Sequence, residues 1–194
     1  RPGHRSLSPH TGEAAMEQTE AILIRKQAWS DTSLITTWLT SGHGKITAMA
    51  RAARRPGSPF AGRLDLFHKA EIGCAMPKRG SLHTLSEVKL LEVFAATSAS
   101  NLFLCGYFAE LIDLVTQPGE PFPEIYDLFS RATAHLSRSP ASVRALEFFE
   151  SELCRMLGIH DGTPCARAAI ETYCGRIPSS RMAALQLLNP RTTP

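Results

Sequence analysis

A run of cations is the part of this sequence best suited to bind a ligand. Between Lys45 and Arg63 the chain also carries Arg51, Arg54 and Arg55, and no acidic residue interrupts the run. Guanidinium groups keep their charge and offer planar donors that match phosphate and carboxylate oxygens. Glycine, proline and serine then follow, which is typical of a loop. The pattern predicts contact with a polyanion, either a nucleic acid or an acidic protein segment.

The two halves of the chain have opposite charge, although the formal net charge is only +3. Residues 42–80 hold eight lysines and arginines against two acidic residues, whereas residues 91–163 hold four against ten. Such asymmetry suggests a nucleic-acid surface on the first part and a different partner for the second.

Short, β-branched segments predict five strands before residue 95. They are residues 21–27, 33–40, 45–52, 69–75 and 82–94, with turns such as Ser41-Gly42-His43-Gly44 between them. Five such strands predict a small closed barrel, and an SH3-like barrel fits the count nearly as well. In the third strand, alternation places Ile46 toward the core and Lys45 on the opposite face, together with Arg51.

Helical periodicity replaces the strand pattern after Phe94. Residues 102–115 are apolar on two faces, which is typical of a central helix, and residues 125–136 carry one apolar stripe. Ser139-Pro140 resembles a helix start and Gly158 a helix stop, while residues 180–188 form a short last helix. The expected fold class is therefore α+β, with a β-barrel followed by a helical bundle.

Aromatic residues near the arginines could stack on bases. Phe60 and Phe67 lie near the arginines in the sequence, but the core is the favoured interpretation for both. Trp29 and Trp38 are likewise interpreted as packing residues.

Neither catalysis nor a bound metal is expected. The chain contains no phosphate loop, nucleophile elbow, His-Glu-x-x-His motif or dinucleotide fingerprint. His160, Cys165 and Cys174 suggest zinc by residue type, but the two cysteines lack the close paired spacing of a structural zinc site. No cofactor is therefore predicted.

Composition favours a cytoplasmic protein. The five cysteines are an odd number, no export signal precedes them, and no apolar run is long enough to span a bilayer. Residues 1–16 are expected to form a disordered leader, with Met16 as a candidate translation start.

Three segments resemble the bacterial RecO family of recombination mediators over about residues 20–160. The first is Ser30-Asp31 before a β-branched strand. The second is residues 50–55, Ala-Arg-Ala-Ala-Arg-Arg, followed by Gly62 and Leu66-Phe67. The third is Arg155-Met156-Leu157-Gly158-Ile159 at the end of the bundle. Many family members carry a four-cysteine zinc module after this point, but here the paired spacing is lost, so zinc is not carried over.

The resemblance implies an OB-fold domain over residues 17–94, a helical domain over residues 95–194, and no enzymatic activity. It implies binding to single- and double-stranded DNA, annealing of complementary strands and help in loading RecA onto coated DNA. The implied partners are RecR, the acidic C-terminal tail of single-strand-binding protein, RecA indirectly, and in some bacteria RecF. The expected DNA-binding residues are Arg51, Arg54 and Arg55 at the centre, with Lys45, Arg63, Lys78 and Arg79 at the flanks.

Two other functions fit the same residues. A protein-interaction adaptor could use the arginines to bind an acidic tail, because a phosphate strand and a tail rich in Asp and Glu are both polyanions. An OB-type barrel could also bind RNA in the translation apparatus.

Overall fold

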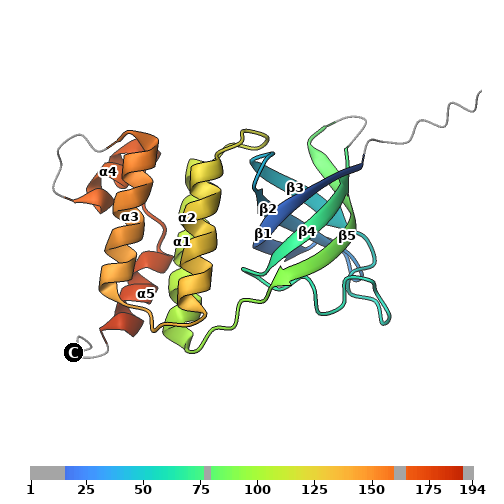
Figure 1. Ribbon diagram of the computed structural model, residues 1–194, viewed down its shortest axis with the longest axis horizontal. Helices are drawn as coiled ribbons and strands as arrows, with labels where there is room; N and C mark the ends of the chain where they lie inside the picture. The colour runs from blue at the N-terminus through green and yellow to red at the C-terminus, as the bar shows by residue number, and fades with distance from the viewer. Residues whose placement is uncertain (1–15, 77–79, 160–164, 190–194) are drawn as a thin grey trace, which may run out of the picture.

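The computed structural model describes residues 16–76, 80–159 and 165–189, and it begins with a five-stranded barrel (Figure 1). The expected leader, apart from Met16, lies outside these residues. The strands are β1 (Met16–Ala28), β2 (Leu34–Thr40), β3 (Lys45–Ala50), β4 (Lys69–Ala75) and β5 (Leu82–Glu92). They close in the order β1-β2-β3-β5-β4, with β3 and β5 parallel and the other pairs antiparallel. This barrel confirms the predicted OB fold.

Alternating small and large apolar residues fill the barrel. Trp38, Ile46, Ile72 and Val88 point into the interior from four different strands. Phe60 and Leu64 join them from the connection between β3 and β4, so this connection is anchored in the core although it is not a strand. A loop fixed in this way can hold side chains in place on its outer surface.

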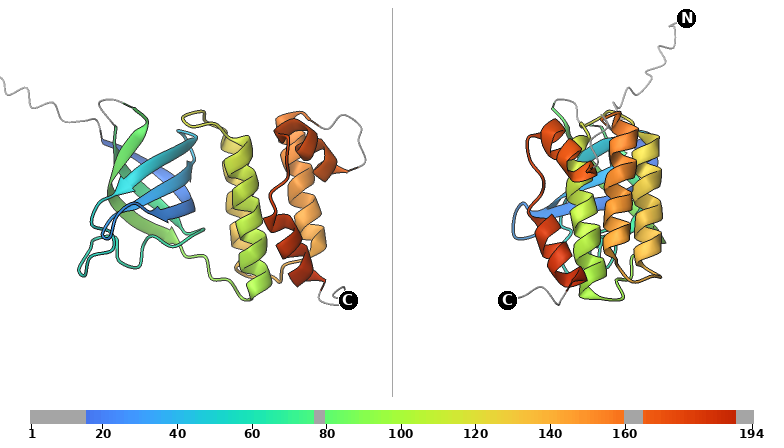
Figure 2. Two further views of the ribbon diagram at one scale, coloured as in Figure 1. Left: turned by 180° about the vertical axis from the view of Figure 1, so that it is seen from behind. Right: turned by 90° about the vertical axis from the view of Figure 1, so that its left-hand side faces the viewer.

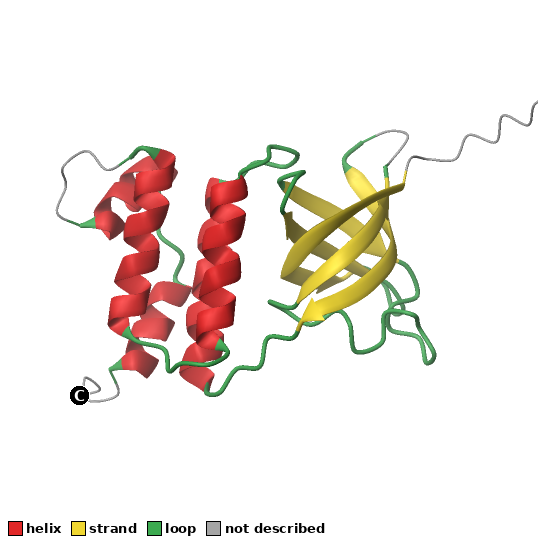
Figure 3. Ribbon diagram, in the orientation of Figure 1, coloured by secondary structure: helices red, strands yellow, loops and turns green. Residues whose placement is uncertain are grey.

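Five helices follow and form a layer separate from the strands (Figure 3). They are α1 (Ala99–Val115), α2 (Pro123–Leu136), α3 (Val143–Leu157), α4 (Ala166–Cys174) and α5 (Ser180–Leu188). Helix α1 is central as predicted, because it packs against α2, α5 and the barrel strand β1. Figure 2 shows this arrangement from behind and end-on. None of the described helices has the length and apolar character needed to cross a membrane.

The predicted start of α3 was wrong by one turn, and α4 was not predicted. Ser142 is the N-cap of α3, and its hydroxyl accepts a hydrogen bond from the Ala145 amide at 3.1 Å. Serine serves equally well at either position, so the sequence offered two competing starts. Gly158 ends the helix with a φ of 66°, as predicted.

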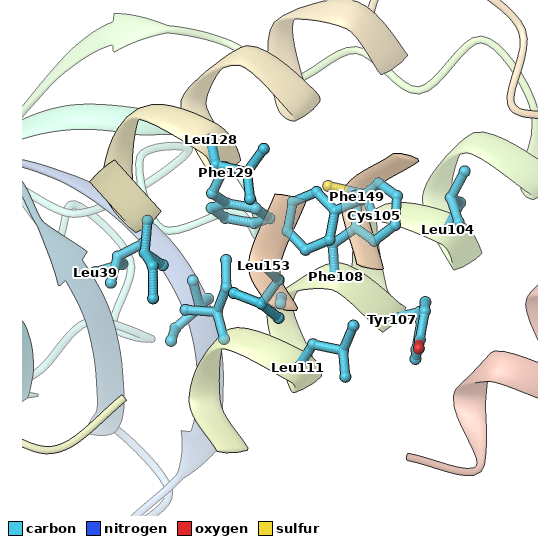
Figure 4. Packing of buried hydrophobic residues seen from close by; sticks show 14 of the residues in the cluster. Leu39, Leu104, Cys105, Tyr107, Phe108, Leu111, Leu128, Phe129, Phe149 and Leu153 are labelled. Carbon is cyan, nitrogen blue, oxygen red and sulfur yellow. The ribbon is translucent and has the colours of Figure 1, made fainter. Parts of the chain in front are cut away.

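The barrel and the helices share one apolar core. Leu39 and Phe67 of the barrel part pack with Phe129, Leu111 and other helical residues, and Figure 4 shows Leu39 facing the helices. The division into domains at residue 94 stays a prediction. A shared core of this kind holds the two parts as neighbours in one folded unit.

Candidate nucleic-acid interface

The connection between β3 and β4, residues 51–68, is called the arginine loop here. Its first part, after β3, projects from the side of the barrel that faces away from the helices, drawn in teal in Figures 1 and 2, whereas Phe67 near its end packs in the core shared with the helices. Successive turns shape it, with backbone hydrogen bonds from Arg55 to Ala52 at 3.1 Å and from Arg63 to Phe60 at 3.0 Å. Gly57 and Gly62 take positive φ values of 75° and 70°, which suits residues without a Cβ.

Four arginines of this loop are exposed: Arg51, Arg54, Arg55 and Arg63. Arg54 is tied to the β1–β2 turn, because its backbone amide donates to the Thr32 carbonyl at 2.9 Å and its Nη1 lies 3.5 Å from the Ser30 carbonyl. Nη1 of Arg63 donates to the Val88 carbonyl at 3.0 Å. Hydrogen bonds to neutral carbonyls hold these side chains without cancelling their charge.

Among the residues that the structure describes, none of the four arginines forms an ion pair. The other described lysines and arginines of the barrel pair with carboxylates: Arg25 and Lys45 with Asp113, Lys26 with Asp65, Lys69 with Glu20 and Glu92, and Lys89 with Glu71. Within the described part of the barrel, the arginines without an ion pair are therefore concentrated on the arginine loop.

Lys45, predicted at the flank of this surface, is instead buried against the helices, and its DNA binding stays a prediction. Its side chain is only 11% exposed, and Nζ donates to the Asp113 carboxylate and to the Asp113 carbonyl, both at 2.7 Å. Strand alternation correctly placed Lys45 opposite Ile46, but helix α1 covers that face at this end of β3. The lysine therefore links the barrel to the helices.

The remaining flanking cations, Lys78 and Arg79, lie outside the described residues. Their assignment to the surface stays a prediction.

The sequence analysis did not identify Lys26, at the end of β1. Its Nζ donates to the Leu64 carbonyl at 2.7 Å and lies 2.9 Å from the Asp65 carboxylate. The hydrogen bond and charge of Lys26 lower the pKa of Asp65 against the opposing effect of burial.

The aromatic residues separate into buried and exposed ones. Phe60, Phe67 and Trp38 are buried, as predicted. Trp29 is 64% exposed, so its interpretation as a packing residue was wrong. It stands at the tight turn between β1 and β2, beside the polar run 30–33, and that polar context was the available signal.

A shallow hollow of about 340 Å³ lies between the end of β1 and the arginine loop. Its lining residues are Lys26, Gln27, Ala28, Leu34 and Arg54. The hollow thus brings together the ends of two strands and one of the unpaired arginines.

Comparison with known proteins bears on this barrel directly. Residues 16–94 match the family model described as "Recombination protein O N terminal". A protein named DNA repair protein RecO from Rhodopirellula baltica is 33% identical over 158 residues, which cover 80% of this chain and 57% of that protein. The barrel belongs to the RecO N-terminal family, and most of the chain is similar to proteins named DNA repair protein RecO.

Two further RecO relatives show how far the similarity extends. The Syntrophus aciditrophicus protein is 26% identical over 153 residues, covering 78% of this chain and 59% of that protein. The Xanthomonas campestris protein is 27% identical over 180 residues, covering 87% and 74%. The chain thus spans less than two thirds of the length of the first two relatives.

Of the three residues that suggested zinc by their type, His160 lies outside the described residues. Cys165 is exposed just before α4, and Cys174 is half-buried at its end. Within the described ranges, no group of three or more His, Cys, Asp or Glu side chains is placed to hold a metal ion.

The helical part that follows the RecO-type barrel contains a cavity of about 440 Å³ between α1, α2 and α3. Its apolar wall includes Phe108, Leu128 and Phe149, with Phe148 at 56% exposure. The cations at this cavity are Arg131, which pairs with Asp127 at 2.8 Å, and Arg144, which forms no ion pair with a described residue. Apolar walls beside exposed cations suit an acidic peptide that also carries an apolar side chain.

Proposed function

We propose that this chain binds single- and double-stranded DNA through the arginine loop and serves as a mediator of DNA repair and homologous recombination. The observation that carries the proposal is the group of four exposed arginines without ion pairs, on a barrel whose other described cations are neutralised. The name "DNA repair protein RecO" of the relatives supports the same role. The proposal includes a cytoplasmic location and no catalytic activity.

Phosphate neutralisation is the proposed mechanism. Each arginine that contacts a phosphate releases a condensed counterion, so binding weakens as salt rises. Contacts to phosphates carry no base information, so binding should depend little on sequence. Annealing follows because one cationic surface reduces the repulsion between two complementary strands. Help in loading RecA onto coated DNA, together with RecR and in some bacteria RecF, extends the proposal on the strength of family membership.

The salt dependence of binding tests the proposal. If four arginines contact a single strand, log K should fall against log salt with a slope of about −2.8, at 0.7 per phosphate contact. The double variant Arg54→Ala/Arg55→Ala should reduce the slope to about −1.4. The measurement is a titration of labelled oligonucleotides at several salt concentrations. An unchanged slope in the double variant would refute the assignment.

A matched control separates this loop from charge in general. Arg155 and Arg167 are exposed on helices, where each pairs with a glutamate on its own helix. The double variant Arg155→Ala/Arg167→Ala removes the same charge and should leave the slope almost unchanged. A strand-annealing assay on both double variants, with and without single-strand-binding protein, tests the mediator role.

A second function, binding of the acidic tail of single-strand-binding protein, is favoured by the helical cavity. Arg144, which forms no ion pair with a described residue, supplies a cation at its edge, and Phe148 offers exposed aromatic surface beside the buried rings of Phe108 and Phe149. We expect Arg144→Ala and Phe148→Ala each to weaken binding of a labelled tail peptide while leaving the DNA salt slope intact. Arg54→Ala/Arg55→Ala should reduce the DNA salt slope and leave binding of the tail peptide unchanged.

The same pair of assays discriminates the other functions. If the acidic peptide binds the arginine loop and displaces DNA from it, the chain is an adaptor and DNA is not its natural ligand. If single-stranded RNA binds more tightly than DNA of equal length and sequence, the chain is an RNA-binding protein. We expect DNA and peptide to bind together without competition.

A further inference from the structure

We infer that Trp29 stacks on an unpaired base, so that this end of the barrel prefers single-stranded to double-stranded DNA. The inference rests on the proposed function, because it adds a base contact to the phosphate contacts of the arginine loop. Its starting point is that Trp29 is 64% exposed although indole is among the largest apolar groups available to the core.

The backbone around Trp29 is held firmly. The Trp29 amide donates to the Ser33 carbonyl at 3.0 Å, and the hydroxyl of Ser30 accepts from the amides of Thr32 and Ser33 at 3.4 and 3.2 Å. These bonds close a compact turn between β1 and β2. An aromatic ring on such a turn loses little backbone freedom when a ligand binds.

The same turn is bonded to the arginine loop. Arg54 reaches it twice, through its amide to Thr32 and through its guanidinium to Ser30, the residue that follows Trp29. Ala28, the residue before Trp29, lines the hollow that also contains Arg54. Trp29 therefore lies on the same turn that the Arg54 guanidinium contacts, close enough along the surface for both to meet one bound strand.

Stacking requires an unpaired base. In a duplex both faces of each base are already stacked, whereas a single strand can present a base to an aromatic ring. The other described aromatic residues within the barrel, Trp38, Phe60 and Phe67, are buried and cannot serve. Trp29 therefore supplies the base contact, and the arginines bind the phosphates of either form.

Tryptophan fluorescence provides a direct measurement. The chain contains two tryptophans, and Trp38 has 0% exposure inside the barrel. Quenching by added oligothymidine therefore reports on Trp29. We expect strong quenching with single-stranded oligothymidine and little with a duplex or with an abasic oligomer of equal length. Quenching of equal size by the abasic oligomer would overturn the inference.

Affinity supplies the second measurement. Trp29→Ala should weaken single-strand binding by about fivefold to a hundredfold, the range for loss of one stacked base. Its duplex affinity and salt slope should stay at wild-type values, and Trp29→Phe should recover most of the single-strand affinity. Circular dichroism of both variants checks that the barrel is folded, as expected for a substitution at an exposed side chain.

The outcomes separate the two proposals. If wild-type protein binds no DNA, or binds without salt dependence, the proposed function is wrong. If wild-type binding shows the expected slope but Trp29→Ala binds single strands as tightly as wild type, only the stacking role is wrong.

Discussion

Substitution of Arg181 by methionine should destabilise the helical part, because Arg181 neutralises a buried carboxylate. Glu150 on α3 is 2% exposed, and it accepts hydrogen bonds from Arg181 Nε at 2.6 Å and Nη2 at 3.1 Å. Tyr107 on α1 donates its hydroxyl to the same carboxylate. Burial, followed by the Glu150 charge, raises the pKa of Tyr107, so this hydroxyl keeps its proton.

The magnitude follows from the burial of the pair. Removing one partner of a buried ion pair costs about 3–5 kcal/mol, because the other charge is left without compensation. The Tyr107 hydroxyl remains as a donor to Glu150, which favours the lower end, about 3 kcal/mol. For a chain of this size each kcal/mol lowers Tm by about 2–4 °C, so Arg181→Met should lower Tm by about 6–12 °C.

Denaturant unfolding followed by two probes measures the effect. Circular dichroism reports the helices, and tryptophan fluorescence reports the barrel, because both tryptophans lie in the barrel part. The shared core predicts that the two transitions shift together. Arg167→Met is the control, since Arg167 pairs with Glu171 in an exposed position and its loss should cost less than about 0.5 kcal/mol.

A double variant completes the test. In Glu150→Leu/Arg181→Met no buried charge remains, and the Tyr107 hydroxyl loses its partner at a cost of about 1 kcal/mol. The double variant should therefore be more stable than Arg181→Met alone. The reasoning is refuted if Arg181→Met lowers the free energy of unfolding no more than Arg167→Met does, or if the double variant is less stable than Arg181→Met alone.

Two further predictions concern stability away from this network. Gly44→Ala should lower the free energy of unfolding by about 2 kcal/mol or more, because φ is +67° and a Cβ would lie 2.1 Å from the Glu120 carbonyl oxygen. Gly42→Ala is the control: a Cβ there would meet nothing within 4 Å, so its thermal unfolding should be close to that of the wild type. Burial lowers the pKa of His68, and its Nδ1 accepts a hydrogen bond from the Phe94 amide at 3.3 Å. As the pH falls, the imidazole of the unfolded chain therefore becomes protonated before that of the folded chain. Stability should therefore fall as pH falls below about 6.5, and His68→Asn should weaken that dependence in urea unfolding at pH 7.5 and 5.5; an identical pH dependence in the variant would contradict this.

Local patterns were sufficient to predict most of the fold. Alternation of apolar residues located the five strands, and periodicity located α1, α2 and α5. Local rules could not predict which barrel faces the helices cover. Lys45 shows this limit, since its position on the strand was predicted correctly and its environment was not. Trp29 shows the same limit for an apolar residue. Its side chain suggested packing, but the core does not extend to the turn on which it lies, and it is exposed.

The pairing pattern of the barrel cations gives the binding surface its physical basis. Asp113 at the end of α1 accepts both Arg25 and Lys45, so the helical part neutralises the cations on the side that it covers. Glu20, Glu71 and Glu92 do the same along β1, β4 and β5. Among the described residues, no carboxylate of a strand or helix pairs with an arginine of the arginine loop, and the loop's own Asp65 pairs with Lys26. Under the proposed function, a bound polyanion would supply negative charge there. The opposite charges of the two halves of the sequence therefore have a structural consequence. Asp113 of the acidic helical part pairs with cations on one side of the barrel, and the arginines of the other side keep their positive charge.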